Sequence, residues 1–457
     1  MAQQPSIPKG TRDFSPAEMV RRNYIFETIK SVFQLYGYQP IETPAMENLS
    51  TLLGKYGEEG DKLLFKILNS GDYLEKIPSH LWRDQNPVQS EITGLISEKG
   101  LRYDLTVPFA RFVVQNRNEI TLPFKRYQIQ PVWRADKPQK GRYREFYQCD
   151  VDVIGSNSLM NEVELVLIIN DVFRKLGIAN IIKLNNRKVL YGIAEYLGAT
   201  DKFVALTTAI DKLDKTGFQK VEEELLLGGL RPASIERLKG ILTFEGTNED
   251  KINFLASSLE GTQAGRDGLN EISGITGLLK DIELSTEIVF DLTLARGLNY
   301  YTGSIFEVVA RDMKFGSICG GGRYDDLTGI FGLPGIPGVG VSFGADRIYD
   351  VMFEQQLFPE TTIVSTQVMF VNFGEKEQKY CLNLAEKLRA SGIIAEIYPD
   401  IARLKKQMSY ADSRKISFAV LVGENEMAEN LVTVKEMKSG SQSKMTISEL
   451  ISKIKIG

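Results

Sequence analysis

The amino-acid sequence predicts an α+β protein whose core is interrupted by a helical domain and followed by a separate α/β domain. Three observations lead to this class. Residues 123–155 have the alternating pattern of a long β-hairpin, residues 186–283 have helical spacing of apolar side chains, and residues 367–457 alternate between strand and helix signals. We therefore expect a core made of residues 1–185 and 284–356, which the helical domain divides.

Composition limits the possible functions. A chain of 457 residues with 43% hydrophobic content can hold two or three domains, and a net charge of −4 leaves any nucleic-acid binding to local patches. Cys149, Cys319 and Cys381 are far apart and His80 is the only histidine, so we expect neither a structural zinc site nor a disulfide framework. No apolar run approaches membrane-spanning length, and the N-terminus lacks the pattern of a signal or transit peptide. We expect a soluble, cytoplasmic protein that does not bind membranes.

The first elements are a helix and a short strand. Ser15 is a helix N-cap, a proline follows it and Glu18 completes a capping box, so a helix begins here and continues to a stop at Gly37. A strand at residues 39–43 comes next. Glycines and a proline then break the chain up to residue 100, and one strand signal stands out at residues 63–68.

A further strand is expected at residues 101–108, before a helix at about residues 108–114. Asp104 and Thr106 are two apart, so on a strand their side chains face the same way. From the residues alone, the more common interpretation is an exposed aspartate and an ordinary strand threonine.

The hairpin is the stretch most informative about function. Its strands, residues 125–134 and 142–154, are joined by a loop that contains Pro138 and Gly141. One face is apolar and is expected to look inward, with Tyr127, Ile129, Trp133, Tyr147, Cys149, Val151 and Val153. The other face carries Gln128, Gln130, Arg134, Arg144, Phe146, Gln148, Asp150 and Asp152. Arginines beside an aromatic ring suit a nucleotide, because a guanidinium binds phosphate and stacks on flat rings, whereas a solvated sheet face explains this composition less well.

The later core elements alternate between helix and strand. We expect a helix at residues 161–176 closed by Gly177, and strands at residues 181–184, 287–292 and 304–309. A glycine-rich segment, Ile318–Asp325, lets a ligand approach the backbone, although tight packing explains it equally well. Gly338–Ile348 runs from a glycine-rich strand into a helix with Arg347 in its first turns.

Two other segments complete the chain. The loop at residues 294–303 carries Arg296 beside Gly297, followed by Tyr300 and Tyr301. An arginine there can lie at the bottom of a pocket, whereas a tyrosine pair is more often core packing. The last domain shows strands at residues 368–373, 393–397, 418–422 and 431–436, with helices around residues 381–388 and 403–413 and at the C-terminus.

Several of these segments resemble one family. Residues 133–152 closely resemble the motif 2 hairpin of class II aminoacyl-tRNA synthetases, and more narrowly the histidine-specific synthetase family, nearer its eukaryotic-type branch. Residues 294–303 resemble the signature that separates this family from other class II members. The first helix and the strand up to Pro44 resemble motif 1, residues 338–348 resemble motif 3, and residues 367–457 resemble the anticodon-binding domain of the same group. The resemblance covers essentially the whole chain.

This resemblance implies a fold and a reaction. The fold would be a class II catalytic core, an antiparallel sheet flanked by helices, with a helical insertion that helps to clamp the tRNA acceptor arm and a C-terminal α/β anticodon-binding domain. The reaction would convert L-histidine and ATP to histidyl-adenylate and pyrophosphate, and then transfer histidine to the 3′-terminal ribose of tRNA(His). Mg²⁺ would accompany the ATP phosphates, no zinc is expected, and motif 1 implies a homodimer.

The resemblance also assigns roles to residues. It places ATP against Arg134, Arg142, Arg144, Phe146 and Arg347, and histidine against Asp104, Thr106, Arg134, Gln148, Asp152, Arg296, Tyr300 and Tyr301. Arg134 and Arg296 are the expected catalytic residues, and no side chain is expected to bind a metal. The bacterial branch carries Glu at the positions of Asp104 and Asp152. The shorter side chains here would need the backbone or a water to close the gap to the substrate.

Three other functions are weighed against this one. A non-catalytic paralogue, the synthetase-like regulatory subunit of the first enzyme of histidine biosynthesis, generally lacks the C-terminal domain and part of the arginine set, whereas this chain keeps both. An RNA-sensing module that binds uncharged tRNA would tolerate loss of the ATP residues, and none is lost. A class II ligase for proline or threonine is disfavoured by residues 296–303.

Overall fold

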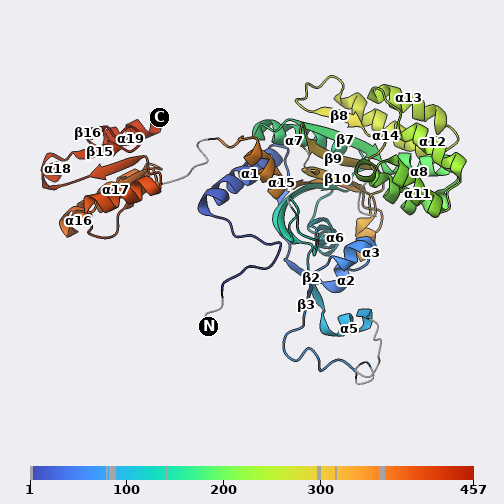
Figure 1. Cartoon of the computed structure of the whole chain (residues 1–457), viewed down its shortest axis with the longest axis horizontal. Coiled ribbons are helices and arrows are strands. Elements are labelled where there is room, and N and C mark those ends of the chain that lie inside the picture. The colour runs from blue at the N-terminus through green and yellow to red at the C-terminus, as the bar shows by residue number, and fades with distance from the viewer. Residues whose placement is uncertain are drawn as a thin grey trace. The chain divides into compact units, whose positions relative to one another are not determined.

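A large mixed sheet organises the first of two units in the chain. The computed structural model describes residues 4–78, 81, 89–139, 141–295, 300–313, 316–359 and 366–456. The chain divides into the units Met1–Phe358 and Pro359–Gly457, each with its own hydrophobic core and sheet (Figure 1). The predicted α+β class is confirmed.

The sheet of the larger unit has eight strands. In spatial order they are β1 (Gln39–Pro40), β5 (Phe124–Trp133), β6 (Glu145–Ile154), β11 (Gly338–Gly344), β10 (Cys319–Tyr324), β9 (Ser304–Ala310), β7 (Asn180–Asn186) and β8 (Glu287–Phe290). Pairing is antiparallel from β5 to β7, as expected for the core. The outermost pairs, β1 with β5 and β7 with β8, are parallel.

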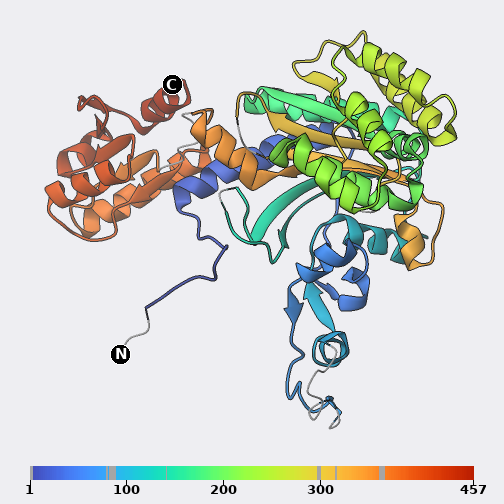
Figure 2. The ribbon, with the colours of Figure 1, turned by 45° about the vertical axis from the view of Figure 1, so that its right-hand side comes forward.

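Three helices cover one face of this sheet. They are α1 (Pro16–Leu35), α7 (Met160–Leu176) and α15 (Ala345–Glu354). Helix α1 contacts the other two, and together they pack on strands β5, β6 and β11 (Figure 2). The capping box predicted for α1 is present, because the Ser15 hydroxyl accepts from the Glu18 amide and the Glu18 carboxylate accepts from the Ser15 amide. Helix α7 ends at Gly177 in the left-handed conformation, with φ 71°.

The hairpin faces lie as predicted except at Trp133, which is outside the main core and donates to the Glu145 carboxylate at 2.8 Å. Cys149, Val151 and Val153 are buried in the main core beneath the helices, whereas Asp150 and Asp152 point to the other side of β6. Arg126 of β5 is the register partner of Asp152, and Gln128 is that of Asp150. The second strand begins at Glu145 rather than at residue 142, since the preceding residues belong to the loop.

The prediction of a strand at residues 101–108 is wrong. Strand β4 (Lys99–Leu101) ends before Asp104, and Thr106 is the first residue of helix α6 (Thr106–Gln115). The reason is a local hydrogen bond: the Asp104 carboxylate accepts from the Val107 amide at 3.1 Å, which satisfies a first-turn donor of the helix.

Strand β4 belongs to a small separate sheet. Its order is β2 (Met46–Asn48), β4, β3 (Lys66–Ile67), and all pairs are antiparallel. Short helices α2 (Leu49–Leu52), α3 (Gly57–Lys62) and α5 (Gln89–Ile96) lie in the same stretch of chain. The strand predicted at residues 63–68 is therefore present but shorter, and His80 lies outside the described residues.

The predicted insertion is helical throughout its described residues. It comprises α8 (Arg187–Leu197), a 3₁₀ turn (Thr200–Lys202), α9 (Phe203–Asp211), α10 (Leu213–Thr216), α11 (Phe218–Leu227), α12 (Pro232–Leu242), α13 (Asn248–Ser258) and α14 (Gln263–Leu279). Because β7 precedes it and β8 follows it, the insertion is the crossover between two neighbouring parallel strands.

The smaller unit is an α/β domain. Its sheet has the order β13 (Ala395–Ile397), β12 (Val368–Phe370), β14 (Phe418–Leu421), β15 (Val432–Glu436), β16 (Gln442–Met445). Its helices are α16 (Glu375–Ala390), α17 (Leu404–Ser413), α18 (Glu424–Glu429) and α19 (Ile447–Ile456). The sequence analysis missed the short α18 and β16. Among the described residues of either unit, no helix is long and apolar enough to cross a membrane.

We predict that Gly192→Ala destabilises the insertion. A Cβ on Gly192 of α8 would lie 2.4 Å from the Gly265 Cα of α14, so the two helices would have to separate. The expected loss is about 1–3 kcal/mol of unfolding free energy. The matched control is Gly240→Ala in α12, where a new Cβ meets no atom within 4 Å and should stabilise the helix by about 0.5–1 kcal/mol. Thermal unfolding followed by circular dichroism would measure both, and equal shifts would contradict the packing argument.

Candidate active site

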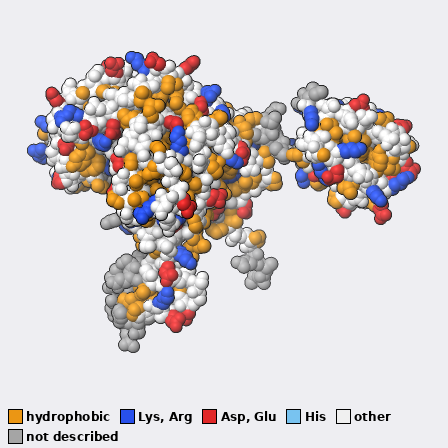
Figure 3. Space-filling model, turned by 180° about the vertical axis from the view of Figure 1, so that it is seen from behind, with side chains coloured by type: hydrophobic (Ala, Val, Ile, Leu, Met, Phe, Trp, Pro, Cys, Tyr) orange, Lys and Arg blue, Asp and Glu red, His pale blue; other side chains and the backbone are white. Residues whose placement is uncertain are grey.

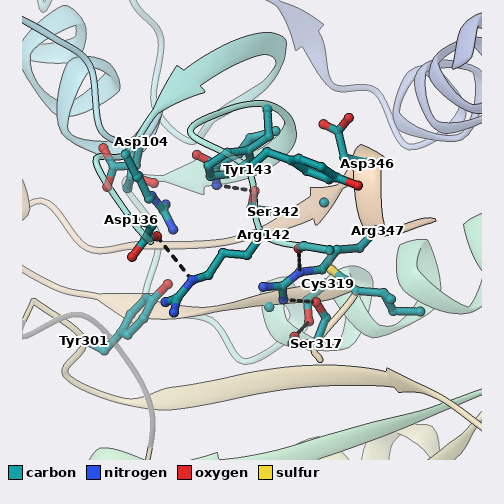
Figure 4. Close-up of a pocket in the computed structure, with 18 of the residues that line it drawn as sticks. Asp104, Asp136, Arg142, Tyr143, Tyr301, Ser317, Cys319, Ser342, Asp346 and Arg347 are labelled. Atoms are coloured by element: carbon teal, nitrogen blue, oxygen red, sulfur yellow. Dashed lines mark hydrogen bonds and ion pairs between the residues drawn. The ribbon is translucent and has the colours of Figure 1, made fainter. Parts of the chain in front are cut away.

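A cavity of about 280 Å³ opens on the polar face of the large sheet (Figure 4). Its walls come from the start of α6, the β5–β6 hairpin, the loop before β9, strand β10 and the junction of β11 with α15. The lining residues are Asp104, Thr106, Arg134, Asp136, Gly141, Arg142, Tyr143, Phe146, Gln148, Tyr300, Tyr301, Ser317, Ile318, Cys319, Gly320, Ser342, Gly344, Asp346 and Arg347. In Figure 4, Asp104 and Tyr301 lie at one end, and Arg347 and Asp346 at the other.

Three arginines of this wall have protein acceptors. Arg134 donates to the Tyr103 carbonyl at 3.1 Å, and Arg142 pairs with Asp136 at 3.3 Å. Arg347 donates to the carbonyls of Gly141 and Ser317 at 3.0 and 2.6 Å (Figure 4). An anionic ligand offers stronger, charge-assisted hydrogen bonds than a neutral carbonyl does, so a phosphate could take over such donors.

Arg144 does not line this cavity. Its Nε donates to the Asp136 carbonyl at 3.1 Å, Nη1 reaches the Lys9 carbonyl at 3.4 Å, and its backbone amide donates to the Gly10 carbonyl at 2.8 Å. The side chain therefore packs on the N-terminal segment. A phosphate contact, as predicted from the sequence, would require it to leave that segment.

The opposite end of the cavity presents hydrogen-bond acceptors. Asp104 is 2% exposed, and its carboxylate accepts from the hydroxyls of Tyr56 at 3.1 Å and Tyr300 at 3.3 Å. Burial raises the pKa of Asp104, although the Val107 amide and Arg134 oppose that rise. The Gln148 amide nitrogen donates to Ser342 at 2.7 Å, and its buried oxygen has no hydrogen-bond partner among the described residues. An ammonium group would satisfy both acceptors.

Asp152 lies behind this end, at a second and much smaller cavity. That cavity holds about 20 Å³ and is lined by Thr106, Asp150, Asp152, Tyr301, Gly320, Gly321, Tyr324, Gly340, Val341 and Ser342. Four of these residues, Thr106, Tyr301, Gly320 and Ser342, also line the larger cavity. Asp152, whose carboxylate is predicted to bind the imidazole ring of the substrate, therefore lies deeper in the protein than the predicted residues that line the larger cavity.

The Asp346 carboxylate joins the site to the N-terminal segment. It pairs with Arg12, with Arg22 of α1 at 2.5 Å, and with the Tyr147 amide of β6 at 2.9 Å. Arg12 also stacks over the Tyr143 ring, 3.4 Å from its centroid. One buried carboxylate on α15 therefore holds three segments that are far apart in the sequence.

Comparison with known proteins identifies the family. The profile described as histidyl-tRNA synthetase matches residues 10–74 and 97–348. The chain belongs to the histidyl-tRNA synthetase family. A second profile, described as an anticodon binding domain, matches residues 367–456.

Individual relatives of the family agree with the profiles. The histidine–tRNA ligase of Phocaeicola vulgatus is 57% identical over 455 residues, with full coverage of both chains. That of Porphyromonas gingivalis is 57% identical and covers 96% of each chain. The crystal structure of histidyl-tRNA synthetase from Nostoc sp. PCC 7120 covers 99% of each chain with a TM-score of 0.82 and 29% identity. The chain has the class II synthetase fold.

Most residues predicted from the family motifs meet in one place. Asp104, Thr106, Arg134, Arg142, Phe146, Gln148, Tyr300, Tyr301 and Arg347 all line the larger cavity. Arg296 lies outside the described residues. The prediction missed several lining residues. Ser342, Gly344 and Asp346 lie in the predicted motif 3 segment and could have been named from it, whereas Ser317 carries no signal in the sequence.

We predict that Asp346→Ala destabilises the larger unit. The substitution would leave the Arg22 guanidinium, which is 4% exposed, buried without its carboxylate. Losing one partner of a buried ion pair costs about 3–5 kcal/mol. Urea unfolding followed by tryptophan fluorescence reports on this unit, because Trp133 belongs to its strand β5. The control Glu27→Ala, at an exposed carboxylate of α1 that pairs with Lys30 at 3.7 Å, should change stability by less than about 0.5 kcal/mol. Similar losses in both variants would contradict this role for Asp346.

Proposed function

We propose that this chain is a histidine–tRNA ligase, which activates L-histidine with ATP to histidyl-adenylate and pyrophosphate and transfers the histidine to the 3′-terminal ribose of tRNA(His). The observation that carries the proposal is the two-ended cavity, where three arginines and an aromatic ring adjoin an acceptor-rich end. The relatives with 57% identity along nearly the whole chain carry this name.

ATP would bind at the arginine end. Phe146 lies in the cavity wall 5.1 Å from the Arg134 guanidinium, so that adenine could stack on the ring while the α-phosphate meets the guanidinium. Arg347 would exchange its two carbonyl acceptors for the other side of adenine and the γ-phosphate. Arg142 would give up its ion pair with Asp136 and bind the β- and γ-phosphates instead. Arg144 could reach these phosphates only if its side chain left the N-terminal segment.

Histidine would bind at the acceptor end. Asp104, Thr106 and the unpaired Gln148 oxygen would hold the α-ammonium, because an ammonium has three donors to satisfy. Asp152 and the Tyr301 hydroxyl would read the two ring nitrogens, and Tyr300 would support Asp104. Buried polar groups left unpaired by a different amino acid discriminate more strongly than a lost apolar contact does.

The first step would form a bond between a histidine carboxylate oxygen and the α-phosphorus, and would break the bond from that phosphorus to the oxygen bridging the β-phosphate. Pyrophosphate leaves with the bond electrons, and no proton moves. The attack brings two anions together, so positioning and fixed positive charge lower the barrier. Arg134 would supply that charge, together with Arg296. In the second step the terminal ribose hydroxyl would form a bond to the acyl carbon while the bond from that carbon to the phosphate oxygen breaks. AMP leaves with the bond electrons, and the hydroxyl proton passes to the leaving phosphate group or to water.

Mg²⁺ would enter with the ATP phosphates, as part of the nucleotide substrate. The described residues hold no group of three or more His, Cys, Asp or Glu side chains arranged to bind a metal. The arginines of the cavity wall fit this arrangement, because they bind phosphate oxygens directly.

tRNA would contact more than one part of the chain. On the face shown in Figure 3, lysines and arginines are interspersed with acidic side chains, so local sites and not a general field would bind RNA. In the smaller unit, Arg403, Lys405 and Lys406 are exposed at the start of α17. We propose that residues 367–457 bind the anticodon, that residues 186–283 hold the acceptor arm, and that the core of residues 1–185 and 284–356 works as a cytoplasmic homodimer.

The first prediction from this function is histidine-dependent exchange of pyrophosphate into ATP without tRNA. Exchange assayed with each of the twenty amino acids should occur with histidine alone. Exchange with another amino acid would overturn the specificity assignment. No exchange from folded protein would favour a regulatory or RNA-sensing paralogue.

The second prediction concerns Arg134→Ala. Removing a positive charge placed at the α-phosphate should slow pyrophosphate exchange by about 100-fold or more. The control Arg311→Ala removes an exposed arginine that pairs with Glu287 at 2.7 Å, away from the cavity, and should leave the rate unchanged. A near-normal rate in Arg134→Ala would remove that residue from the proposed reaction.

A further inference from the structure

Four buried polar side chains lie together beneath the acceptor end of the cavity. They come from three strands of the large sheet, with β11 between the last two: Arg126 from β5, Asp150 and Asp152 from β6, and Tyr324 from β10. Arg126 Nη2 is 2.8 Å from Asp152 Oδ2 and 3.8 Å from Asp150 Oδ2, and the Tyr324 hydroxyl donates to Asp152 Oδ1 at 2.6 Å. The exposed fraction of each is at most 3%. Burying such charges costs several kcal/mol per ion, so stability alone is a poor reason to keep them.

The cluster is incompletely paired within the protein. Arg126 Nε and Asp150 Oδ1 are buried and have no hydrogen-bond partner among the described residues. Both aspartates and Tyr324 line the small cavity, whose volume of about 20 Å³ has room for one water molecule. A Cβ on Gly340 would lie 2.0 Å from Asp152 Oδ1, so glycine at this position leaves the space that the carboxylate occupies. The site therefore has room and hydrogen-bonding capacity for a polar group that enters from the larger cavity.

The charges of the cluster do not cancel. Arg126 supplies one positive charge against two carboxylates, and burial raises the pKa of Asp150 to about 7 and raises that of Asp152, while Arg126 opposes both rises. Other titratable groups that face the pair are Tyr324 from β10, Tyr301 before β9 and Asp104 before α6. Tyr38, Cys149 and Cys319 adjoin it from the apolar side of the sheet, and β11 contributes the Ser342 hydroxyl.

We propose that Arg126 and Tyr324 are positioning residues that keep the Asp152 carboxylate ionised and aimed at the imidazole ring of the substrate. The inference rests on the proposed function and adds residues to it. Arg126 lines neither cavity, so it acts through Asp152 and not by touching the ligand. An ionised carboxylate accepts a hydrogen bond from an imidazole N–H, whereas a protonated one loses part of that capacity. The water that fits the small cavity would bridge the gap left by the short aspartate.

The test uses the full chain and pyrophosphate exchange at pH 6, 7, 8 and 9. For Arg126→Met, the KM for histidine should be about tenfold or more above that of the wild type at pH 7. This follows because losing Arg126 should remove about one pKa unit of stabilisation from the ionised form of Asp152. The ratio should fall as the pH rises towards 9, because hydroxide restores the aspartates to their ionised form. Titration of histidine itself cancels in the ratio. The KM for ATP should stay within about twofold, since the arginine end of the cavity is intact.

Matched variants separate positioning from packing. Lys125→Met changes the neighbouring cation, which pairs with Glu164 on the other face of β5, and should leave both KM values unchanged. Arg126→Lys keeps the charge and should recover part of the histidine affinity. If Arg126→Met does not fold, Tyr324→Phe provides the test. It should raise the histidine KM by about threefold or more through loss of one hydrogen bond to a charged group, whereas Tyr127→Phe should not.

The outcomes distinguish this inference from the proposed function. Wild-type exchange with histidine, together with a histidine KM ratio near one for both Arg126→Met and Tyr324→Phe, would overturn the inference and leave the function standing. A raised ratio that does not change with pH would also overturn it, because the loss would then be one of packing. If the wild-type chain shows no exchange with histidine, the proposed function itself fails.

Discussion

The two-residue period of strand β6 is the constraint on which the site depends. Cys149, Val151 and Val153 are held in the core beneath the helices, so the side chains between them must emerge on the opposite face. A slip of one residue would bury the arginine and carboxylate face in the apolar core, which fixes the register strongly. The same alternation continues across the sheet, where Val341 of β11 enters the core and Ser342 reaches the cavity.

On strand β10, two neighbouring side chains point to opposite faces of the sheet and make different contacts. Arg323 points to the helix side and pairs bidentately with Glu162 of α7 at 2.6 and 2.7 Å, a fully satisfied buried ion pair. Its neighbour Tyr324 points to the other side and donates to Asp152. The first pair fastens a strand to a helix. The second belongs to a cluster with unpaired groups and spare room, where a water or a ligand can complete the hydrogen bonding.

The sequence predicted the elements better than their contacts. The Ser15 capping box, the faces of the hairpin and the helical insertion all follow from patterns within a few residues, and the structure has them. The prediction of a strand around Asp104 is wrong because the sequence does not distinguish two kinds of aspartate. One accepts a hydrogen bond from a backbone amide in the first turn of a helix, as Asp104 does, and the other lies at the end of a strand. The family motifs identify most of the cavity residues from the sequence, whereas Ser317 belongs to no recognisable pattern.

The sequence by itself determined which side of each strand or helix a residue occupies, because that depends only on the local period of the backbone. Tertiary structure alone decided which side chains meet. Arg144 shares a polar face with Phe146 in the predicted strand, yet in the structure it precedes β6, and its long side chain turns to the Lys9 carbonyl and away from the cavity. Likewise Arg12 and Arg22 each lie more than three hundred residues from Asp346 in the chain, and both still bind its carboxylate. Such contacts arise from packing between distant segments, which no local period encodes.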